Sequence, residues 1–303
     1  MSEAFRSGFV AIVGRTNVGK STLMNRLIGM KIAITSGKPQ TTRRRLQTVF
    51  TNEKGQIVFV DTPGIHLPHN RLSEYMDNTA YKSVSEVDLI LFVVEPETYI
   101  GKGEQRMIER IKRAGRPVIL AVNKSDTTDG EHIEAAIRTY REALEICEAV
   151  PVSALKGINT DALIDTIISR LPEGPMLYDE DTVTDETERD IVAEIIREKT
   201  LRNLKEEVPH GIAVSVLTFR ERDNGLIDIE ADVICEKDSH KGIVIGKGGS
   251  MLKKIGTESR KDIEQLLESR VNLKLFVKVR QDWRQDPMML KSLGYTDKDK
   301  GRK

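Results

Sequence analysis

The sequence contains few cysteines, no long apolar run and no net charge. Its two cysteines, Cys147 and Cys235, are too few for a disulfide framework in 303 residues, and neither lies in a pattern typical of a reactive or metal-binding thiol. The longest uninterrupted apolar stretch, residues 89–94, is far shorter than the roughly 20 residues needed to cross a bilayer. Residues 1–6 lack the apolar segment of a signal peptide. We therefore expect a cytoplasmic protein without a transmembrane helix.

Length and composition indicate a globular protein of about two domains. The chain is 39% hydrophobic, which is enough for packed cores, and 31% charged. Short apolar runs alternate with helical patterns from residue 8 to residue 171, which is typical of an α/β domain with a doubly wound, mainly parallel sheet. A Pro and Gly-rich break and an acidic segment follow. The predicted parts are a first domain at 1–172, a linker at 173–187 and a second domain at 188–303.

A phosphate-binding loop is the clearest signal in the first domain. The run GRTNVGKS at residues 14–21 follows a short apolar stretch and leads into an amphipathic run, so a strand feeds a glycine-rich loop that opens a helix. In such a loop the backbone N–H groups point at phosphate oxygens, Lys20 can reach the β and γ phosphates, and the Ser21 hydroxyl can ligate Mg²⁺. The residues expected to hold the nucleotide here are Gly14, Asn17, Val18, Gly19, Lys20, Ser21 and Thr22.

Two further motifs predict recognition of guanine. The run NKSD follows a buried apolar run at 117–122 and so lies at the carboxyl end of a parallel strand. The Asp126 carboxylate can accept the N1–H and N2–H donors of guanine, a pair that adenine lacks, while Lys124 covers the purine face and Asn123 ties the loop down. A polar turn is the alternative interpretation. After another short strand, Ser153, Ala154 and Leu155 can turn a backbone N–H toward the guanine O6.

Two polar segments between these motifs predict the magnesium and γ-phosphate contacts. Asp61 begins the run DTPG directly after an apolar strand, where its carboxylate can hold Mg²⁺ through water and Gly64 can offer its N–H to the γ-phosphate. Thr42, in the run QTTR, can complete the Mg²⁺ shell and sense the γ-phosphate. The predicted catalytic residues are Lys20, Thr42, Asp61 and Gly64, and the predicted metal ligands are Ser21, Thr42 and Asp61.

The second domain has the pattern of an RNA-binding module. A helical segment precedes two alternating runs at 212–219 and 226–234 that are joined by a hairpin turn. The run GKGG, a helix and a last strand near 273–279 follow. This order is similar to that of a type II KH domain, a small α+β fold, in which the glycines let single-stranded RNA approach closely and Lys247 attracts phosphate. The predicted RNA-binding residues are Gly246, Lys247, Gly248 and Gly249.

Charge supports a nucleic-acid partner for this second domain. Residues 237–303 contain 17 Lys and Arg against 9 Asp and Glu, a net charge of +8, so residues 1–236 carry −8. The net charge of zero therefore results from an acidic first part and a basic C-terminal part that cancel. A solvated helix face with a basic tail is the alternative interpretation.

With these motifs the chain resembles the Era-type GTPases, in which a P-loop GTPase domain precedes a KH domain. The likeness covers nearly the whole chain and rests on GRTNVGKS, QTTR, DTPG, NKSD, SAL and GKGG. It implies that the protein hydrolyses GTP with Mg²⁺, switches shape between its GTP and GDP states, and binds 16S rRNA near its 3′ end during assembly of the small (30S) ribosomal subunit. The family also implies a peripheral location on the cytoplasmic face of the inner membrane, although we expect residues 286–293 to form a packed terminal helix.

Two residues raise separate questions about catalysis. Ile65 follows DTPG where Ras-like switches carry a glutamine that orients the attacking water, so we expect slow hydrolysis without a partner. Asn17 resembles an asparagine that helps to hold K⁺ beside the phosphates in several related GTPases, and the alternative is that Asn17 only supports the loop.

Two other functional classes are a nucleotide-gated RNA scaffold and a small-molecule P-loop kinase. NKSD and the GKGG module argue against the kinase.

Overall fold

The computed structural model describes residues 4–35, 42–61 and 70–295. The chain forms two compact units. The first consists of Met1–Ala33, Thr42–Pro68 and Met76–Asp185, and the second consists of Ile34–Thr41, His69–Tyr75 and Glu186–Lys303. Each unit has its own apolar core, so each is described by itself.

A six-stranded sheet organises the first unit, with the strand order β2-β3-β1-β4-β5-β6. Only β2 runs antiparallel to its neighbour, and the other pairs are parallel. Every residue of β3, β4 and β5 is buried, as expected for strands covered on both faces. The strands are β1 (Arg6–Val13), β2 (Leu46–Asn52), β3 (Gly55–Asp61), β4 (Leu89–Val94), β5 (Val118–Val122) and β6 (Glu148–Pro151).

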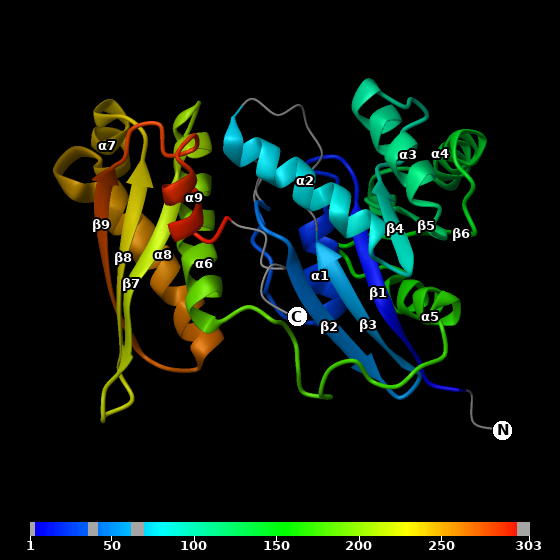
Figure 1. The fold of residues 1–303 in the computed structure, drawn as a ribbon, viewed down its shortest axis with the longest axis horizontal. Helices are drawn as coiled ribbons and strands as arrows, with labels where there is room; N and C mark the ends of the chain where they lie inside the picture. The colour runs from blue at the N-terminus through cyan, green and yellow to red at the C-terminus, as the bar shows by residue number, and fades with distance from the viewer. Residues whose placement is uncertain (1–3, 36–41, 62–69, 296–303) are drawn as a thin grey trace. The chain divides into compact units, whose positions relative to one another are not determined.

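Helices cover both faces of this sheet (Figure 1). One apolar cluster joins α1 and α5 to one face, and a second joins α2, α3 and α4 to the other. The helices are α1 (Lys20–Ile28), α2 (Arg71–Ser85), α3 (Lys102–Ala114), α4 (Gly130–Ala143) and α5 (Thr160–Arg170), with a short 3₁₀ helix η1 (Ser125–Thr127). The doubly wound, mainly parallel sheet predicted from the sequence is therefore confirmed.

Residues 177–184 of the predicted linker lie against the edge strand β2 and its neighbour β3. The Val49 N–H donates to the carbonyl oxygen of Val183 at 2.8 Å. The fully buried Gln56 accepts hydrogen bonds from the Leu177 and Tyr178 N–H groups, at 2.7 and 2.9 Å. The segment thus covers part of an edge that would otherwise expose unpaired backbone groups.

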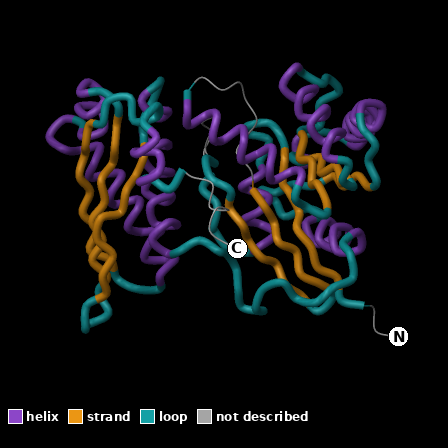
Figure 2. The backbone as a smooth tube through the Cα atoms, viewed as in Figure 1, coloured by secondary structure: helices purple, strands orange, loops and turns teal. Residues whose placement is uncertain are grey.

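The second unit contains a three-stranded sheet with the order β7-β8-β9, in which β8 is antiparallel to β7 and parallel to β9. Helices α6, α7 and α8 share one apolar core with the sheet (Figure 2). This arrangement confirms the predicted KH domain. Its elements are α6 (Glu188–Asn203), η2 (Val208–Gly211), β7 (Ala213–Glu221), β8 (Ile227–Cys235), α7 (Asp238–Ile245), η3 (Lys247–Gly249), α8 (Ser250–Leu267), β9 (Val271–Val279) and α9 (Pro287–Ser292).

The predicted terminal helix corresponds to α9. Asp286 caps its N-terminus by accepting a hydrogen bond from the Met288 N–H at 2.8 Å, and Leu290 is buried. Within residues 4–35, 42–61 and 70–295, the helices are all too short or too polar to span a bilayer.

Candidate functional site

The phosphate loop joins β1 to α1 and depends on two glycines. Gly14 has φ +157°, and an added Cβ would lie 2.3 Å from the carbonyl oxygen of Val93. Gly19 has φ +97°, and an added Cβ would lie 2.3 Å from Nδ2 of Asn123. Asn17 also adopts a left-handed conformation, with φ 67°, which asparagine tolerates better than most residues. The backbone therefore curls as the sequence motif predicts.

Lys20 begins α1 and folds back over this loop. Its Nζ donates hydrogen bonds of 2.8 Å to the carbonyl oxygens of Gly14 and Arg15, and the residue is only 8% exposed. Burial lowers the pKa of Lys20 to about 8, against the opposing influence of Asp61. A buried cation lined by backbone groups is well placed to receive an anionic phosphate. Thr22 follows in the first turn of α1.

The three predicted magnesium ligands form one cluster at the base of the loop. Oδ2 of the fully buried Asp61 lies 3.3 Å from Ser21 Oγ and 3.2 Å from Thr42 Oγ1, and the two hydroxyl oxygens are 3.3 Å apart. Hydroxyl and carboxylate oxygens are the hard donors that Mg²⁺ prefers, so the donor set fits this ion. Two other predicted positions, Gly64 and Ile65, lie outside the described residues.

Asn123 connects the phosphate loop to the second guanine motif. Its side chain is buried, and Nδ2 donates to the carbonyl oxygen of Val18 at 2.7 Å while Oδ1 accepts from the Ala154 N–H at 2.9 Å. Ser153 is fully buried, and Leu155 is 71% exposed. The structure therefore brings the runs GRTNVGKS, NKSD and SAL together, as the sequence predicts.

The remaining guanine residues lie at the carboxyl end of β5. Lys124 has φ 63° and caps η1, which contains Asp126. The Lys124 Nζ forms an ion pair with Glu95. Asp126 is exposed, and no hydrogen bond to its carboxylate comes from the described part of the chain. This carboxylate is thus available to a ligand.

A carboxylate cluster around Arg15 was not predicted. Arg15 Nε lies 3.3 Å from Oε1 of Glu104, which is 1% exposed and also accepts a 2.7 Å hydrogen bond from the Tyr140 hydroxyl. Burial lowers the pKa of Arg15, but the charges of Glu104, Glu97 and Glu95 outweigh it and hold the pKa above its usual value. The arginine in GRTN was the only local signal, because its partners are 80 or more residues away.

The GKGG run forms a tight turn between α7 and α8. Gly246 has φ +73°, and an added Cβ would lie 2.7 Å from the Met251 Cβ. Gly248 and Gly249 also have positive φ angles, 59° and 80°, and a Cβ on either would meet open space. Lys247 is exposed. The turn therefore presents backbone and one cation to solvent, as an RNA-binding loop requires.

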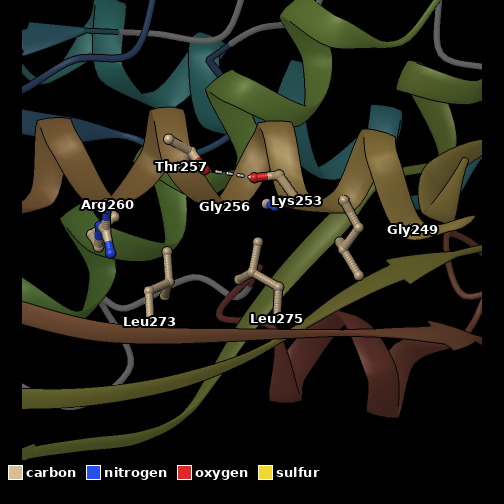
Figure 3. A pocket seen from close by; sticks show the side chains of 8 residues that line it. Gly249, Lys253, Gly256, Thr257, Arg260, Leu273 and Leu275 are labelled. Atoms are coloured by element: carbon tan, nitrogen blue, oxygen red, sulfur yellow. Dashed lines mark hydrogen bonds between the residues drawn. The ribbon is translucent and has the colours of Figure 1, made fainter.

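A groove of about 390 Å³ lies beside this turn, between α8 and β9 (Figure 3). Its floor is apolar, with Leu273 and Leu275 from β9, and two cations, Lys253 and Arg260, extend from α8. Gly256 opens the helix face between them. This groove was not predicted from the sequence, although the spacing of seven between the cations places both on one helix face. The lining residues are Gly249, Leu252, Lys253, Gly256, Thr257, Arg260, Leu273 and Leu275.

These features define a P-loop GTPase domain followed by a KH domain. The family model for 50S ribosome-binding GTPases matches residues 9–124, and the KH domain model matches residues 207–284. The chain is 52% identical to GTPase Era of Clostridium botulinum (strain Eklund 17B / Type B) over 97% of this chain and 100% of the relative. It is 53% identical to GTPase Era of Clostridium acetobutylicum over 96% of this chain and 98% of the relative.

Two solved structures are similar over both domains. Era in complex with MgGDPNP and nucleotides 1506–1542 of 16S ribosomal RNA has a TM-score of 0.93 and 39% identity, covering 97% of this chain and all of that chain. A point variant of Aquifex aeolicus Era bound to GDP and AlF₄⁻ has a TM-score of 0.92 and 38% identity over the same shares. The chain belongs to the GTPase Era family and is a GTPase.

Proposed function

We propose that this protein is a GTP-dependent switch that binds 16S rRNA near its 3′ end and acts in assembly of the 30S subunit. The observation that carries the proposal is that one chain combines a guanine nucleotide pocket with a basic, apolar-floored KH groove. A relative of the same architecture holds both MgGDPNP and 16S rRNA. The family model's description names the 50S subunit, but that model matches only the first domain, whereas this relative matches both.

The phosphate end of the pocket would bind the nucleotide through three kinds of group. The loop N–H groups would donate to the β-phosphate, and the Lys20 ammonium would lie against the β and γ oxygens. Gly64, which lies outside the described residues, stays the predicted N–H donor to the γ-phosphate. Ser21 and Thr42 would hold Mg²⁺ directly, and Asp61 would hold it through water. Magnesium supplies charge neutralisation for the transferred phosphoryl group when bound. The clustering of these oxygens within 3.3 Å supports this assignment.

The base end of the pocket would select guanine. Asp126 accepts from N1–H and N2–H, and the Lys124 stem lies on the purine face. The Leu155 N–H, which has no hydrogen-bond partner among the described residues, donates to O6. Ser153 and Ala154 would support the turn. The Ala154 N–H donates to Asn123 Oδ1, and the Ser153 Oγ accepts from the Lys156 N–H at 3.1 Å.

Hydrolysis would be slow without a partner, because Ile65 has no polar atom to orient water. For Asn17 two roles stay open, a K⁺ ligand and a support for the loop. Replacing KCl with NaCl in a hydrolysis assay separates them, because only a K⁺ ligand makes the rate depend on the cation.

The order of segments along the chain supports coupling between nucleotide and RNA. Residues 34–35, which belong to the second unit, precede Thr42 in the sequence. Within that unit the Thr35 carbonyl oxygen accepts hydrogen bonds from Arg202 Nε and Nη2 at 3.1 and 2.9 Å. Contacts from the γ-phosphate would bear on Thr42, which follows Thr35 by seven residues in the sequence.

A double substitution tests the RNA site. Lys247→Asp with Gly248→Asp should weaken binding of an RNA with the sequence of 16S nucleotides 1506–1542 at least about tenfold, because it replaces a cation and an open backbone with two carboxylates. GTP hydrolysis without RNA should not change. Lys254→Asp serves as the charge control, because Lys254 is exposed and does not line the groove. Normal RNA affinity of the double variant would refute the assignment.

A scaffold in which GTP hydrolysis is incidental is the second candidate. Equal RNA affinities with GDP and with a non-hydrolysable GTP analogue would favour the scaffold.

The cytoplasmic location and a peripheral contact with the inner membrane stay predictions. Sedimentation with anionic vesicles tests the membrane contact.

A further inference from the structure

Arg26 holds the loop that follows β6. Its Nε donates a hydrogen bond to the carbonyl oxygen of Ala154 at 3.2 Å, and its Nη2 donates to the carbonyl oxygen of Leu155 at 2.9 Å. The side chain also lies over Gly157, where an added Cβ would be 3.8 Å from Arg26 Cδ, Nε and Cζ. One planar group therefore donates to two consecutive carbonyl oxygens of the loop. This arrangement suits arginine, because its donors form a rigid fork.

The peptide group between Ala154 and Leu155 is oriented by these contacts. The carbonyl oxygen of this peptide, that of Ala154, accepts from Arg26, while the N–H of the preceding peptide donates to Asn123 Oδ1 at 2.9 Å. In a planar trans peptide the carbonyl oxygen and the following N–H point in opposite directions. The bond from Arg26 to the Ala154 carbonyl therefore sets the direction of the Leu155 N–H, which no described residue accepts.

Arg26 lies on the same helix, α1, as the phosphate-loop residue Lys20. The helix begins with Lys20 at the phosphate loop, and Arg26 lies in its last turn, about 9 Å further along the axis. A single rigid element thus connects the residue that receives the phosphates with the loop that receives the base. The two ends of the pocket are held at a set separation.

We propose that Arg26 is a positioning residue for guanine recognition, which aims the Leu155 N–H at the O6 atom of the base. The inference rests on the proposed guanine pocket and adds a residue that does not itself touch the nucleotide. A purely local role is the competing explanation, because a cation in the last turn stabilises the negative end of a helix. Lysine would serve that role equally well, but it cannot bridge two carbonyl oxygens with a planar fork.

The test compares three nucleotides that differ in the base. GDP and IDP both present O6, whereas 6-thio-GDP presents sulfur, which is a weak acceptor. Dissociation constants are measured by competition against a fluorescent GDP analogue. Arg26→Met should weaken GDP and IDP about five- to tenfold and 6-thio-GDP less than about twofold, because only the first two use the aimed N–H. Arg26→Lys should weaken GDP at least about threefold.

The controls separate this role from a structural one. Arg138→Met removes an exposed arginine from α4 of the same unit and should leave all three constants unchanged. Equal weakening of all three nucleotides by Arg26→Met, wild-type affinities in that variant, or wild-type affinities in Arg26→Lys would each overturn the inference. If the unmodified protein does not prefer GDP to 6-thio-GDP, the Leu155 contact fails and the inference fails with it. Failure of the proposed guanine pocket itself would be seen separately, as ADP competing as well as GDP.

Discussion

We expect GDP binding to weaken as the pH rises, because of Lys20. The residue is 8% exposed, and burial lowers its pKa to about 8 in the ligand-free protein, against the opposing charge of Asp61. A phosphate placed beside the ammonium favours the charged form and so raises the pKa in the complex. Binding therefore takes up a proton wherever Lys20 of the free protein is neutral.

The size of the effect follows from this pKa. At pH 8 Lys20 is half protonated before binding and almost fully protonated after it, so about half a proton is taken up. Lys20 should lower the affinity for GDP about fourfold between pH 6.5 and pH 8.5, because the charged fraction of the free protein falls by that factor. The sign is set by the direction of the shift, since binding raises a pKa that burial had lowered.

Isothermal titration calorimetry measures both quantities. The dissociation constant is followed over this pH range, and the proton uptake is obtained from the dependence of the binding enthalpy on the ionisation enthalpy of the buffer. The terminal phosphate of GDP also titrates, with a pKa of about 6, and could contribute to the pH dependence. The Lys20→Met variant measures that contribution alone. The contribution of Lys20 is the difference in pH dependence between the unmodified protein and this variant. The same pH dependence and the same proton uptake in both would refute the reasoning.

The remaining predictions concern the loop, the base and the cation. Gly14→Ala should abolish nucleotide binding and destabilise the domain by more than about 1 kcal/mol, because its Cβ would lie 2.3 Å from the Val93 carbonyl oxygen; normal GDP affinity in a binding assay would contradict this. Asp126→Asn should shift preference from guanine to xanthine nucleotides, and unchanged selectivity in a competition assay would show that another group reads the base. Hydrolysis in NaCl should be slower than in KCl if Asn17 holds K⁺, and equal rates would remove that role.

Contiguous motifs were the part of the site that the sequence could predict. The phosphate loop, NKSD and GKGG each need residues at set spacings, because neighbouring backbone groups and side chains act on one ligand group. The left-handed angles of Gly19 and Gly248 agree with that expectation. Likewise, mainly apolar runs of strand length predicted the buried strands β3, β4 and β5 of the parallel sheet.

Contacts between distant segments could not be predicted in the same way. The bonds of Gln56 to Leu177 and Tyr178 span more than 120 residues, and neither partner carries a distinctive pattern. The Arg15 carboxylates and the leucine floor of the KH groove are similar cases. Such pairs depend on the register of packed elements, which sequence spacing does not report.

The amino-acid sequence alone determined the two-part organisation, the GTPase domain and the glycine-rich turn of the KH domain, because each follows from a local order of residues. Only the tertiary structure decided that Ser21, Thr42 and Asp61 meet within 3.3 Å, and that Asn123 and Arg26 both hold Ala154 in the loop after β6. The physical reason is that hydrogen bonds act over about 3 Å, whereas their partners are brought to that distance by helices and strands that fold back from far along the chain.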